Sequence, residues 1–487
     1  MPLPPELTLH LHTWLTKAEP SPLPRYKQLY EALRQLILDG LLSPGSRLPS
    51  SRVIAKTLGI ARNTVITAIE QLCAEGYAIT RPKSGIYILA TAPTHFDTNN
   101  TIQPKVSLNL SSRGQTIAAH AKFAPMRGAF ASGIPDLKQF PFELWQRYVA
   151  RHARNPKLDW QANPHQGGDT ELRQILADNL RITRSIRCNS SQILITHGTQ
   201  RSLQLVANLL ADPADTVWVE DPGYSGAKSA FLAAGLNIVG QPIDQEGLSP
   251  PLNAWQHPPK LIYTTPSHQF PTGTVMSATR RRNLLALASQ HQTFVIEDDY
   301  DSEFRYEGNP LAALHALAPQ QVIYLGTFSK TFFPALQIGY MVLPEPLIEA
   351  FRTTQVRHHR EPPYVIQKAL ADFMRDGHVS AHIRKMRREY QLRRDTLVDL
   401  LQNELGGSVR LSGLDTGLHL CLHLPDDRSD QRIAEQAVEK GIMTHAISRF
   451  YIHSDTQHSP ALILGFGDAD VEEILRAGKI LCQIIKT

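Results

Sequence analysis

Residues 326–344 read GTFSKTFFPALQIGYMVLP, a stretch that contains one lysine, Lys330, between small hydroxyl residues and an apolar run. The hydroxyl residues are Thr327 and Ser329, and the apolar run at residues 338–344 has the composition of a buried strand. An amine in a partly apolar pocket loses solvation of its charged form, so its pKa falls and it becomes a nucleophile near neutral pH. The position of Lys330 therefore raises the question of which electrophile it would meet.

Short apolar segments alternate with helical patterns on both sides of this stretch. The helical patterns include TRRRNLLALASQH, and the apolar segments read ILIT (193–196), TVWVE (216–220), KLIYT (260–264), TFVIEDD (293–299), VIYLGT (322–327) and IGYMVLP (338–344). Such alternation predicts a mostly parallel sheet covered by helices on both faces. Ligands of these sheets bind at the carboxyl ends of the strands.

Four phrases directly after predicted strands combine into one candidate site. The turn at Gly198 and Thr199 leads into a helix, whose first N–H groups can hold an anion. Tyr224 lies on a turn, where its ring can cover a flat ligand. Asp298 ends a strand and Tyr300 follows two residues later. Together with Lys330, these groups meet the requirements of pyridoxal 5'-phosphate.

Each residue then has an expected task toward that cofactor. Lys330 would form a Schiff base with the aldehyde, and Asp298 would keep the ring nitrogen protonated so that the ring acts as an electron sink. Tyr300 would hydrogen-bond the phenolic oxygen. The phosphate would be held by Gly198, Thr199, Thr327 and Ser329.

The basic charge of the chain is concentrated near its start. The net charge is +5, and residues 21–90 carry nine Lys and Arg against four acids, so this segment alone accounts for the excess. A local basic excess indicates a polyanionic partner for this segment.

The same segment has the pattern of a winged helix-turn-helix. Three helical patterns are followed by two short alternating strands around Lys83, Ser84 and Gly85, which form a hairpin with a basic tip. Its phrases RLPSSR and ARNTVITAIEQLCAEG resemble the GntR-type winged helix, which implies binding to double-stranded DNA at a promoter or operator. We expect Arg62 and Asn63 to read base edges, and Arg52, Thr64 and Lys83 to contact phosphates. The alternative is that each is an ordinary solvated surface residue.

The large module resembles fold type I aminotransferases over about residues 125–487. The phrases THGTQ, EDPGY, TPSHQFPTG, VIEDDYDSEF and GTFSKTFFPAL carry this resemblance, and the order of the two modules resembles the MocR/GabR group of bacterial regulators. The implied fold is multidomain: an N-terminal winged helix-turn-helix (α+β), then an α/β pyridoxal-phosphate-dependent transferase of fold type I with a small C-terminal α+β subdomain. We expect the DNA-binding domain at residues 22–90, a polar linker at residues 91–120, and the effector and dimerisation domain at residues 121–487.

The sequence departs from the aminotransferase pattern at two positions. Where aminotransferases have an arginine that pairs with the cofactor phosphate, this chain has Gln337, whose amide donates hydrogen bonds but carries no charge. Where they have Asn in an NPTG phrase, it has Phe270, in agreement with the regulators, and we expect His268 and Gln269 beside it to line the site. The resemblance to the regulators also implies that Arg449, in ISRFYIH, binds the carboxylate of an effector.

Several classes are excluded or disfavoured. No run of eighteen apolar residues exists and the start lacks a signal-peptide pattern, so we expect a bacterial cytoplasmic protein that does not span a membrane. The four cysteines contain no CxxC pair, so neither a disulfide framework nor a thiolate zinc site is indicated, and we assign no metal ligands.

Three functions remain open from the sequence. The first, which we favour, is a transcriptional regulator that senses an amine or amino acid, or pyridoxal phosphate itself, through an aldimine at Lys330. The second is an active aminotransferase that carries a DNA-binding arm. The third is a regulator whose large module only dimerises without cofactor. Gln337 argues against sustained turnover, whereas the presence of Lys330 and Asp298 argues against loss of the cofactor. A homodimer is expected.

Overall fold

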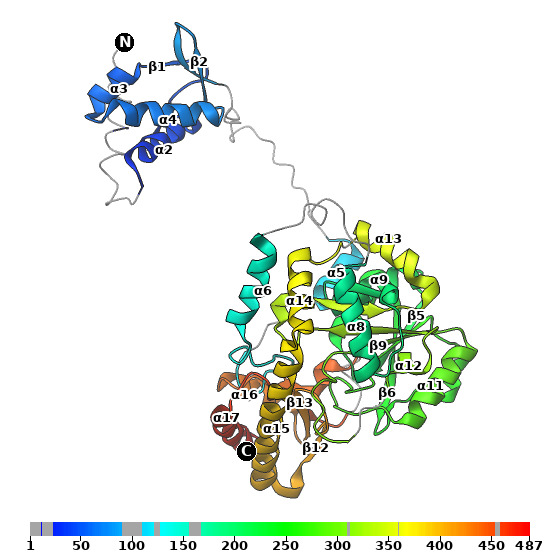
Figure 1. Ribbon diagram of the computed structural model, residues 1–487. Coiled ribbons are helices and arrows are strands. Elements are labelled where there is room, and N and C mark those ends of the chain that lie inside the picture. The colour runs from blue at the N-terminus through cyan, green and yellow to red at the C-terminus, as the bar shows by residue number, and fades with distance from the viewer. Residues whose placement is uncertain are drawn as a thin grey trace. The chain divides into compact units, whose positions relative to one another are not determined.

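The computed structural model describes residues 11, 23–89, 110–120, 127–154, 167–308, 312–358, 360–452 and 458–487. It consists of two compact units, Met1–Asn109 and Leu110–Thr487 (Figure 1). Residues 91–109 of the predicted linker lie outside the described residues, as does residue 90. The rest of that linker contains α5 (Ser112–His120), which contacts α10 (Ser225–Ala234) and groups with the larger unit. The expectation of a linker up to residue 120 is therefore too long at its C-terminal end, because a helix without a clear apolar period packs there.

Within residues 23–89, the smaller unit has three helices and one small sheet. Its elements are α2 (Arg25–Leu38), β1 (Arg47–Leu48), α3 (Ser51–Leu58), α4 (Arg62–Ala74), β2 (Ala78–Arg81) and β3 (Gly85–Ile88). The sheet is antiparallel with the order β1-β3-β2, and apolar residues of α2, α3 and α4 form one core. Gly59 ends α3 with φ of +64°, a left-handed conformation that glycine adopts without steric cost. The predicted helices and hairpin are present.

The larger unit is built on an eight-stranded sheet of order β4-β11-β10-β9-β8-β5-β6-β7. The five strands from β10 to β6 are parallel, whereas β11 is antiparallel to both of its neighbours. The strands are β4 (Ile193–Thr196), β5 (Thr216–Asp221), β6 (Asn237–Asp244), β7 (Gly247–Leu248), β8 (Leu261–Thr264), β9 (Phe294–Asp299), β10 (Val322–Thr327) and β11 (Gly339–Val342). The sheet is therefore mostly parallel, as predicted.

Helices cover both faces of this sheet. The side chains of strand β10 pack against helices on both faces. Ile323 and Leu325 belong to the apolar cluster that contains α9 and α10, whereas Tyr324 belongs to the cluster that contains α8 and α14. Alternate residues of a strand point to opposite faces, so a strand buried on both sides is apolar throughout. The covering helices are α6 (Phe142–Arg154), α8 (Thr170–Thr183), α9 (Thr199–Leu210), α10 (Ser225–Ala234), α11 (Ala278–Gln290), α12 (Leu314–Leu317), α13 (Ile348–His358) and α14 (Tyr364–Arg375).

The C-terminal part forms a smaller α+β subdomain, as expected from the resemblance. Its antiparallel sheet has the order β12-β13-β15-β14 and packs with α15, α16 and α17 around a separate core. The elements are α15 (His378–Leu405), β12 (Arg410–Ser412), β13 (His419–His423), α16 (Asp430–Glu439), β14 (His445–Ala446), β15 (Ala461–Gly465) and α17 (Val471–Lys486). Among the helices of the described residues, none is both long and apolar enough to span a bilayer.

A buried ion pair ties α15 to the loop before α6. The Asp136 carboxylate lies 2.5 Å from Nη2 of Arg393, and both side chains are 5% exposed. Nη1 of Arg393 donates to the Gly467 carbonyl at 2.7 Å, so one guanidinium joins three segments of the larger unit. Removing the acid would leave a buried charge without its counter-ion.

Asp136→Ala is expected to lower the free energy of unfolding by about 3–5 kcal/mol, because an unpaired buried cation is strongly unfavourable. Denaturant unfolding of the full chain measures the change. Glu404→Gln is the matched control, since it removes an exposed ion pair to Lys486 at 2.8 Å and should change stability little. Equal effects of the two substitutions would contradict the structural role of Asp136.

Candidate cofactor site and nucleic-acid interface

Lys330 lies in the turn that follows β10, with its amine in a confined position. Its Nζ donates to the Gly133 carbonyl, and a Cβ built on Gly133 would lie 2.8 Å from that nitrogen. Burial lowers the pKa of the Lys330 amine, and the negative charges of Asp301 and Asp298 partly oppose that shift. A larger fraction of this amine is therefore uncharged near neutral pH than for a solvated lysine.

Asp298 is a buried carboxylate with one oxygen satisfied. The Tyr263 hydroxyl donates to Oδ2 at 2.7 Å, whereas Oδ1 has no partner within the described part of the chain. Burial raises the pKa of Asp298 to about 7, against the Tyr263 hydrogen bond, and the nearby charges of Asp299 and Glu220 raise it further. A cationic N–H directed at Oδ1 would satisfy the free oxygen and favour the carboxylate form. The protonated ring nitrogen of pyridoxal phosphate fits that requirement.

Two tyrosines lie within electrostatic range of Asp298. Tyr224 immediately precedes α10, and its hydroxyl accepts a hydrogen bond of 3.2 Å from Gln200. The Tyr300 hydroxyl donates to the His268 carbonyl at 2.8 Å. Burial raises the pKa of both hydroxyls, and the negative charge of Asp298 contributes to each shift. The structure thus brings Lys330, Asp298, Tyr224 and Tyr300 to one region.

The predicted phosphate-holding residues lie at or just beyond the same end of neighbouring strands. Thr327 pairs with Gly339 and Gly339 with Thr196, two residues before Gly198, so three strand ends meet there. Gly198 is the N-cap residue of α9, with φ of +86°. A Cβ built on Gly339 would lie 2.8 Å from the Cα of Gly198, so the two backbones are in close contact. Thr199 is the first residue of α9, and the Thr327 hydroxyl donates to that of Ser329 at 3.0 Å. Backbone N–H groups and hydroxyls at a helix start suit a phosphate.

Gln337 and Arg449 are the exposed members of the predicted cofactor and effector set. Gln337 is exposed and left-handed, with φ of +50°. Arg449 is exposed in the short helix Ile447–Phe450. The carbonyl of the adjacent Phe450 accepts a hydrogen bond from Gly223 at 3.1 Å, which places this turn against the Tyr224 loop.

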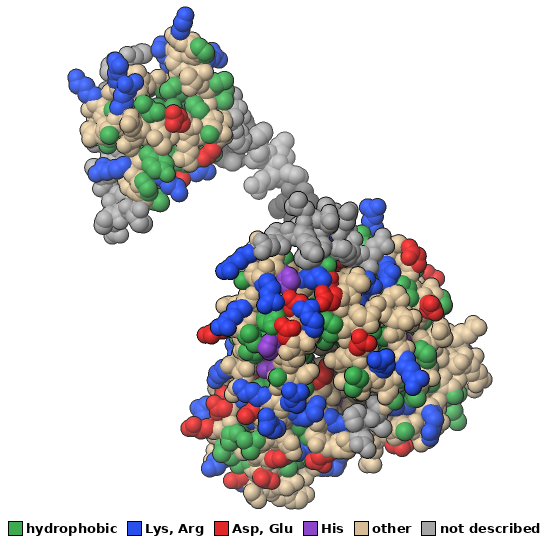
Figure 2. All heavy atoms as spheres, viewed as in Figure 1, with side chains coloured by type: hydrophobic (Ala, Val, Ile, Leu, Met, Phe, Trp, Pro, Cys, Tyr) green, Lys and Arg blue, Asp and Glu red, His purple; other side chains and the backbone are tan. Residues whose placement is uncertain are grey.

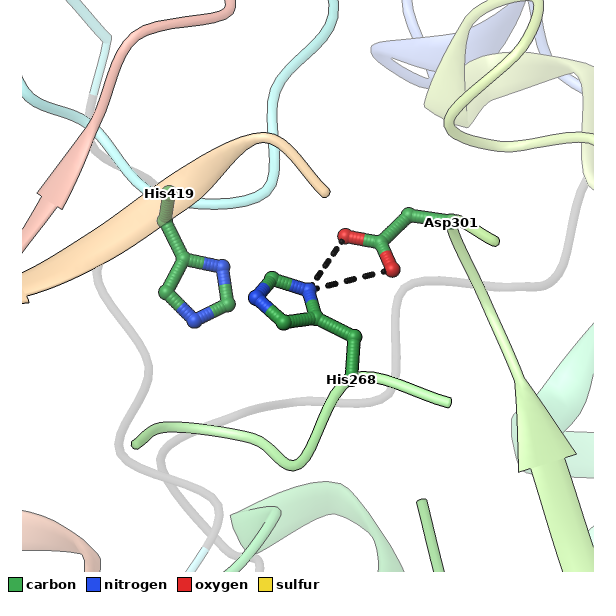
Figure 3. A group of neighbouring side chains, drawn as sticks. All are labelled: His268, Asp301 and His419. Carbon is green, nitrogen blue, oxygen red and sulfur yellow. Dashed lines mark hydrogen bonds and ion pairs between the residues drawn. The ribbon is translucent and has the colours of Figure 1, made fainter. Parts of the chain in front are cut away.

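A His–Asp–His group beside the site was only partly anticipated. Nδ1 of His268 lies 3.0 Å from Oδ2 and 3.2 Å from Oδ1 of Asp301 (Figure 3). The ring centroids of His268 and His419 are 4.5 Å apart. Burial lowers the pKa of His419 well below its usual value, and the charges of His268 and Lys330 add to this effect. Asp301 therefore joins the site as a second carboxylate near Lys330. Its position in EDDYDSEF, just after a strand, was the available signal.

This group has the residue types of a metal site but a different arrangement. Candidate ligand atoms of the three side chains lie within 4.8 Å of one another. Zinc bonds to such ligands are about 2.0–2.2 Å long, so three ligands at that separation would have to move inward to share one ion. The contact present is a hydrogen-bonded His–Asp pair.

The smaller unit presents most of its predicted DNA-contacting residues to solvent. Arg52, Arg62, Asn63 and Lys83 are exposed, whereas Thr64 and Gly85 are half-buried. Arg62 is the first residue of α4, and its Nε donates to the Ser51 hydroxyl of α3 at 3.3 Å, so two helix starts lie together. Lys and Arg side chains project from this unit, with few acids among them (Figure 2). Such a surface is compatible with a polyanion.

Comparisons with known proteins match both units. Residues 25–88 match the family of bacterial regulatory proteins named gntR, and residues 132–463 match aminotransferase class I and II. The chain is 37% identical over 92% of its length to 91% of a probable rhizopine catabolism regulatory protein, MocR, of Rhizobium meliloti. It is 31% identical over 95% of both chains to the pyridoxine biosynthesis transcriptional regulator PdxR of Corynebacterium glutamicum.

Among solved structures, the kynurenine aminotransferase of Pyrococcus horikoshii is similar to this chain. It is 28% identical with a TM-score of 0.67, over 80% of this chain and 98% of the aminotransferase. The gntR match, the aminotransferase match and the full-length similarity to regulators agree. The chain belongs to the MocR-type transcriptional regulators, in which a gntR-type helix-turn-helix domain precedes an aminotransferase class I and II domain.

Proposed function

We propose that this chain is a pyridoxal-phosphate-dependent, DNA-binding regulator that senses an amino compound, or pyridoxal phosphate itself, at Lys330. The observation that carries the proposal is the pairing of a confined amine with a buried carboxylate that has one free oxygen. Lys330 has a lowered pKa, and Oδ1 of Asp298 is unpartnered among the described residues. These are the two groups that an aldehyde on a protonated pyridine ring requires.

Pyridoxal phosphate, when bound, supplies an aldehyde that condenses reversibly with primary amines. Lys330 would hold it as an aldimine, and Asp298 would accept a hydrogen bond from its ring nitrogen. Tyr300 would bond its phenolic oxygen and Tyr224 would cover its ring. The phosphate would lie among Gly198, Thr199, Thr327 and Ser329, with Gln337 as an uncharged donor at its edge.

Sensing follows from competition for that aldehyde. An effector amine that competes with Lys330 for the aldehyde would release the lysine side chain and place its own substituent in the site. Arg449 would bind a carboxylate of that effector. Whichever arrangement of the two units binds the occupied site better becomes more populated, and affinity for DNA changes with it. A homodimer would place two winged helices on one operator.

Catalytic turnover is the second candidate, favoured by the similarity to solved aminotransferases. Gln337 argues against it, because turnover needs the phosphate fixed while the ring moves, and an amide holds a dianion less firmly than a guanidinium. A domain that only dimerises without cofactor is the third candidate. The free oxygen of Asp298 argues against that, since an unused buried carboxylate would be costly.

The wild-type protein with pyridoxal phosphate is expected to show the visible band of a protein-bound imine, and borohydride reduction should fix the adduct on Lys330. Mass spectrometry locates the adduct. Lys330→Ala should lose the band and the effector response but keep DNA binding. Lys228→Ala is the control, since Lys228 is also a partly enclosed amine whose pKa burial lowers to about 8. An adduct on Lys228, or none, would refute the assignment of Lys330.

Arg62→Ala is expected to weaken binding to a DNA sequence selected by the wild-type protein by about 5- to 150-fold, equivalent to roughly 1–3 kcal/mol, and to relax its preference. Lys83→Ala should weaken binding to all DNA sequences by a similar factor. It should also reduce the slope of log affinity against log salt concentration by about 1. Both changes are measured by fluorescence anisotropy at several salt concentrations. Glu70→Gln, an exposed change within α4, is the control. Unaltered binding by both arginine and lysine variants would contradict this interface.

A further inference from the structure

A cavity of about 410 Å³ lies on the face of the large sheet opposite Asp298. Consecutive residues of β9 show the two faces. Asp298 bonds Tyr263, which packs with α9 and α10, whereas Asp299 pairs with Arg184 at 2.7 Å and accepts from Tyr324 at 2.6 Å. Arg184 and Tyr324 both line the cavity. Of the predicted cofactor residues, only Thr327 also lines it.

The wall of this cavity combines apolar and cationic groups. Its apolar part includes side chains of α8, α14 and α15, together with one ring from the turn after β10: Leu176, Leu180, Phe328, Met374, Val379 and Ile383. Its charged part has five arginines and a single acid, Glu303, among the lining residues of the described chain. A volume of this size and mixture is typical of a site for a small organic molecule.

Two of the arginines have their hydrogen-bonding groups engaged by the protein. Arg184 is paired with Asp299, and Arg281 donates to the carbonyls of Met276, Ala312 and Pro266. These two groups therefore support the wall rather than offer strong contacts to a ligand.

The remaining arginines have capacity for an anion. Nε of Arg305 is buried and lacks a partner among the described residues. Arg387 uses Nε and Nη2 on the Glu303 carbonyl at 3.1 and 2.6 Å, which leaves Nη1, and Arg384 is exposed on the same helix. Guanidinium groups bind carboxylates in a bidentate manner, so three on one wall favour a carboxylate ligand.

Glu303 does not cancel this preference. Its Oε2 is buried without a partner in the described part of the protein, and burial together with the charge of Asp299 raises the pKa of Glu303 to about 7. Near neutral pH a substantial fraction of this carboxyl is therefore protonated. In that form it donates a hydrogen bond to a carboxylate instead of repelling it.

The cavity also touches the reverse side of the candidate cofactor site. Thr327 and Thr331, which flank Lys330, belong to its wall, as do Ser302 and Glu303, which follow Tyr300 closely. A molecule in the cavity would therefore contact both segments that carry the predicted cofactor residues.

We propose that this cavity is a second ligand site, which takes a small monocarboxylic acid with an apolar body. The carboxylate lies against Arg305 and Arg387, with Arg384 at the rim, and the apolar body lies against α8, α14 and α15. Because occupancy fixes the segment after β10, it alters the accessibility of Lys330. The binding site itself does not depend on the function proposed for Lys330.

Calorimetric titration of the full chain with hexanoate and hexanamide tests the site, because the two probes share a shape and differ in charge. Hexanoate should bind at least about tenfold more tightly, as expected for loss of a charge-assisted contact. Equal binding of both probes, or no binding of hexanoate, overturns the proposal.

Variants locate the binding of hexanoate. Arg305→Gln should weaken it about tenfold and Arg384→Gln less, whereas Arg388→Gln, exposed on α15 but outside the wall, should not change it. Thermal unfolding shows whether Arg305→Gln is folded. If that variant does not fold, the weaker binding of hexanoate by Arg384→Gln, a change at an exposed residue of the wall, still tests the site. If Arg449→Gln lost hexanoate binding while Arg305→Gln and Arg384→Gln kept it, the anion would bind elsewhere and the proposal would be overturned.

Coupling has its own readout. Saturating hexanoate should change the rate at which an amine-specific reagent modifies Lys330, followed by mass spectrometry, and Arg305→Gln should abolish that change. An unaltered rate with demonstrated binding would refute the coupling to Lys330. This measurement needs no pyridoxal phosphate, so its outcome is separate from that of the proposed function.

Discussion

Asp298 is the penultimate residue of β9, a strand buried on both faces, and its carboxylate has one oxygen bonded to Tyr263 and the other free among the described residues. Desolvation of this group raises its pKa, while the same enclosure lowers the pKa of the Lys330 amine. Burial therefore raises the pKa of the acid and lowers the pKa of the base, because it disfavours the charged form of each group. This constraint depends on the parallel sheet, because only a fully covered sheet buries its strand ends in this way.

The two-residue period of β9 divides the acids of EDDYDSEF between two environments. Asp298 faces the candidate cofactor site, whereas Asp299 faces Arg184, Tyr324 and Ser302, whose groups satisfy Oδ2. Asp301 lies beyond the strand end and pairs with His268. One short segment thus supplies a buried carboxylate with one free oxygen, a structural ion pair and a carboxylate near Lys330, and it also borders the cavity on the far face.

If pyridoxal phosphate binds as proposed, Gln337 would contribute an uncharged side chain near its phosphate, where aminotransferases have an arginine. A phosphate dianion there would be held by hydrogen bonds from the N–H groups of α9 and from hydroxyls such as those of Thr327 and Ser329, without a guanidinium to neutralise it. Weaker retention would suit reversible occupancy, which a sensor of pyridoxal phosphate or of an amine requires. The same loss would hinder repeated turnover.

Much of the fold and of the candidate site follows from the sequence alone. The apolar segments at residues 193–196, 216–220 and 322–327 correspond to β4, β5 and β10, because hydrophobic runs bounded by turns encode buried strands locally. Strand β6 has mostly exposed or half-buried positions and contains Gly240 and Pro242, so its sequence lacks a clear strand signal. The motifs after the strands also indicated Lys330, Asp298 and Tyr300, since a parallel sheet brings its carboxyl ends to one edge.

Only the tertiary structure decided which groups meet across long separations in the chain. Gly133 contacts the Lys330 amine from 197 residues away, and Tyr263 bonds Asp298 from 35 residues away. The cavity likewise combines α8, α14 and α15 with the segments after β9 and β10. Residue type and spacing encode the local backbone, whereas the burial and partners of a charged side chain depend on how distant elements pack. For that reason, the pKa shifts of Lys330 and Asp298 and the free groups of Arg305 and Glu303 emerged only from the packed molecule.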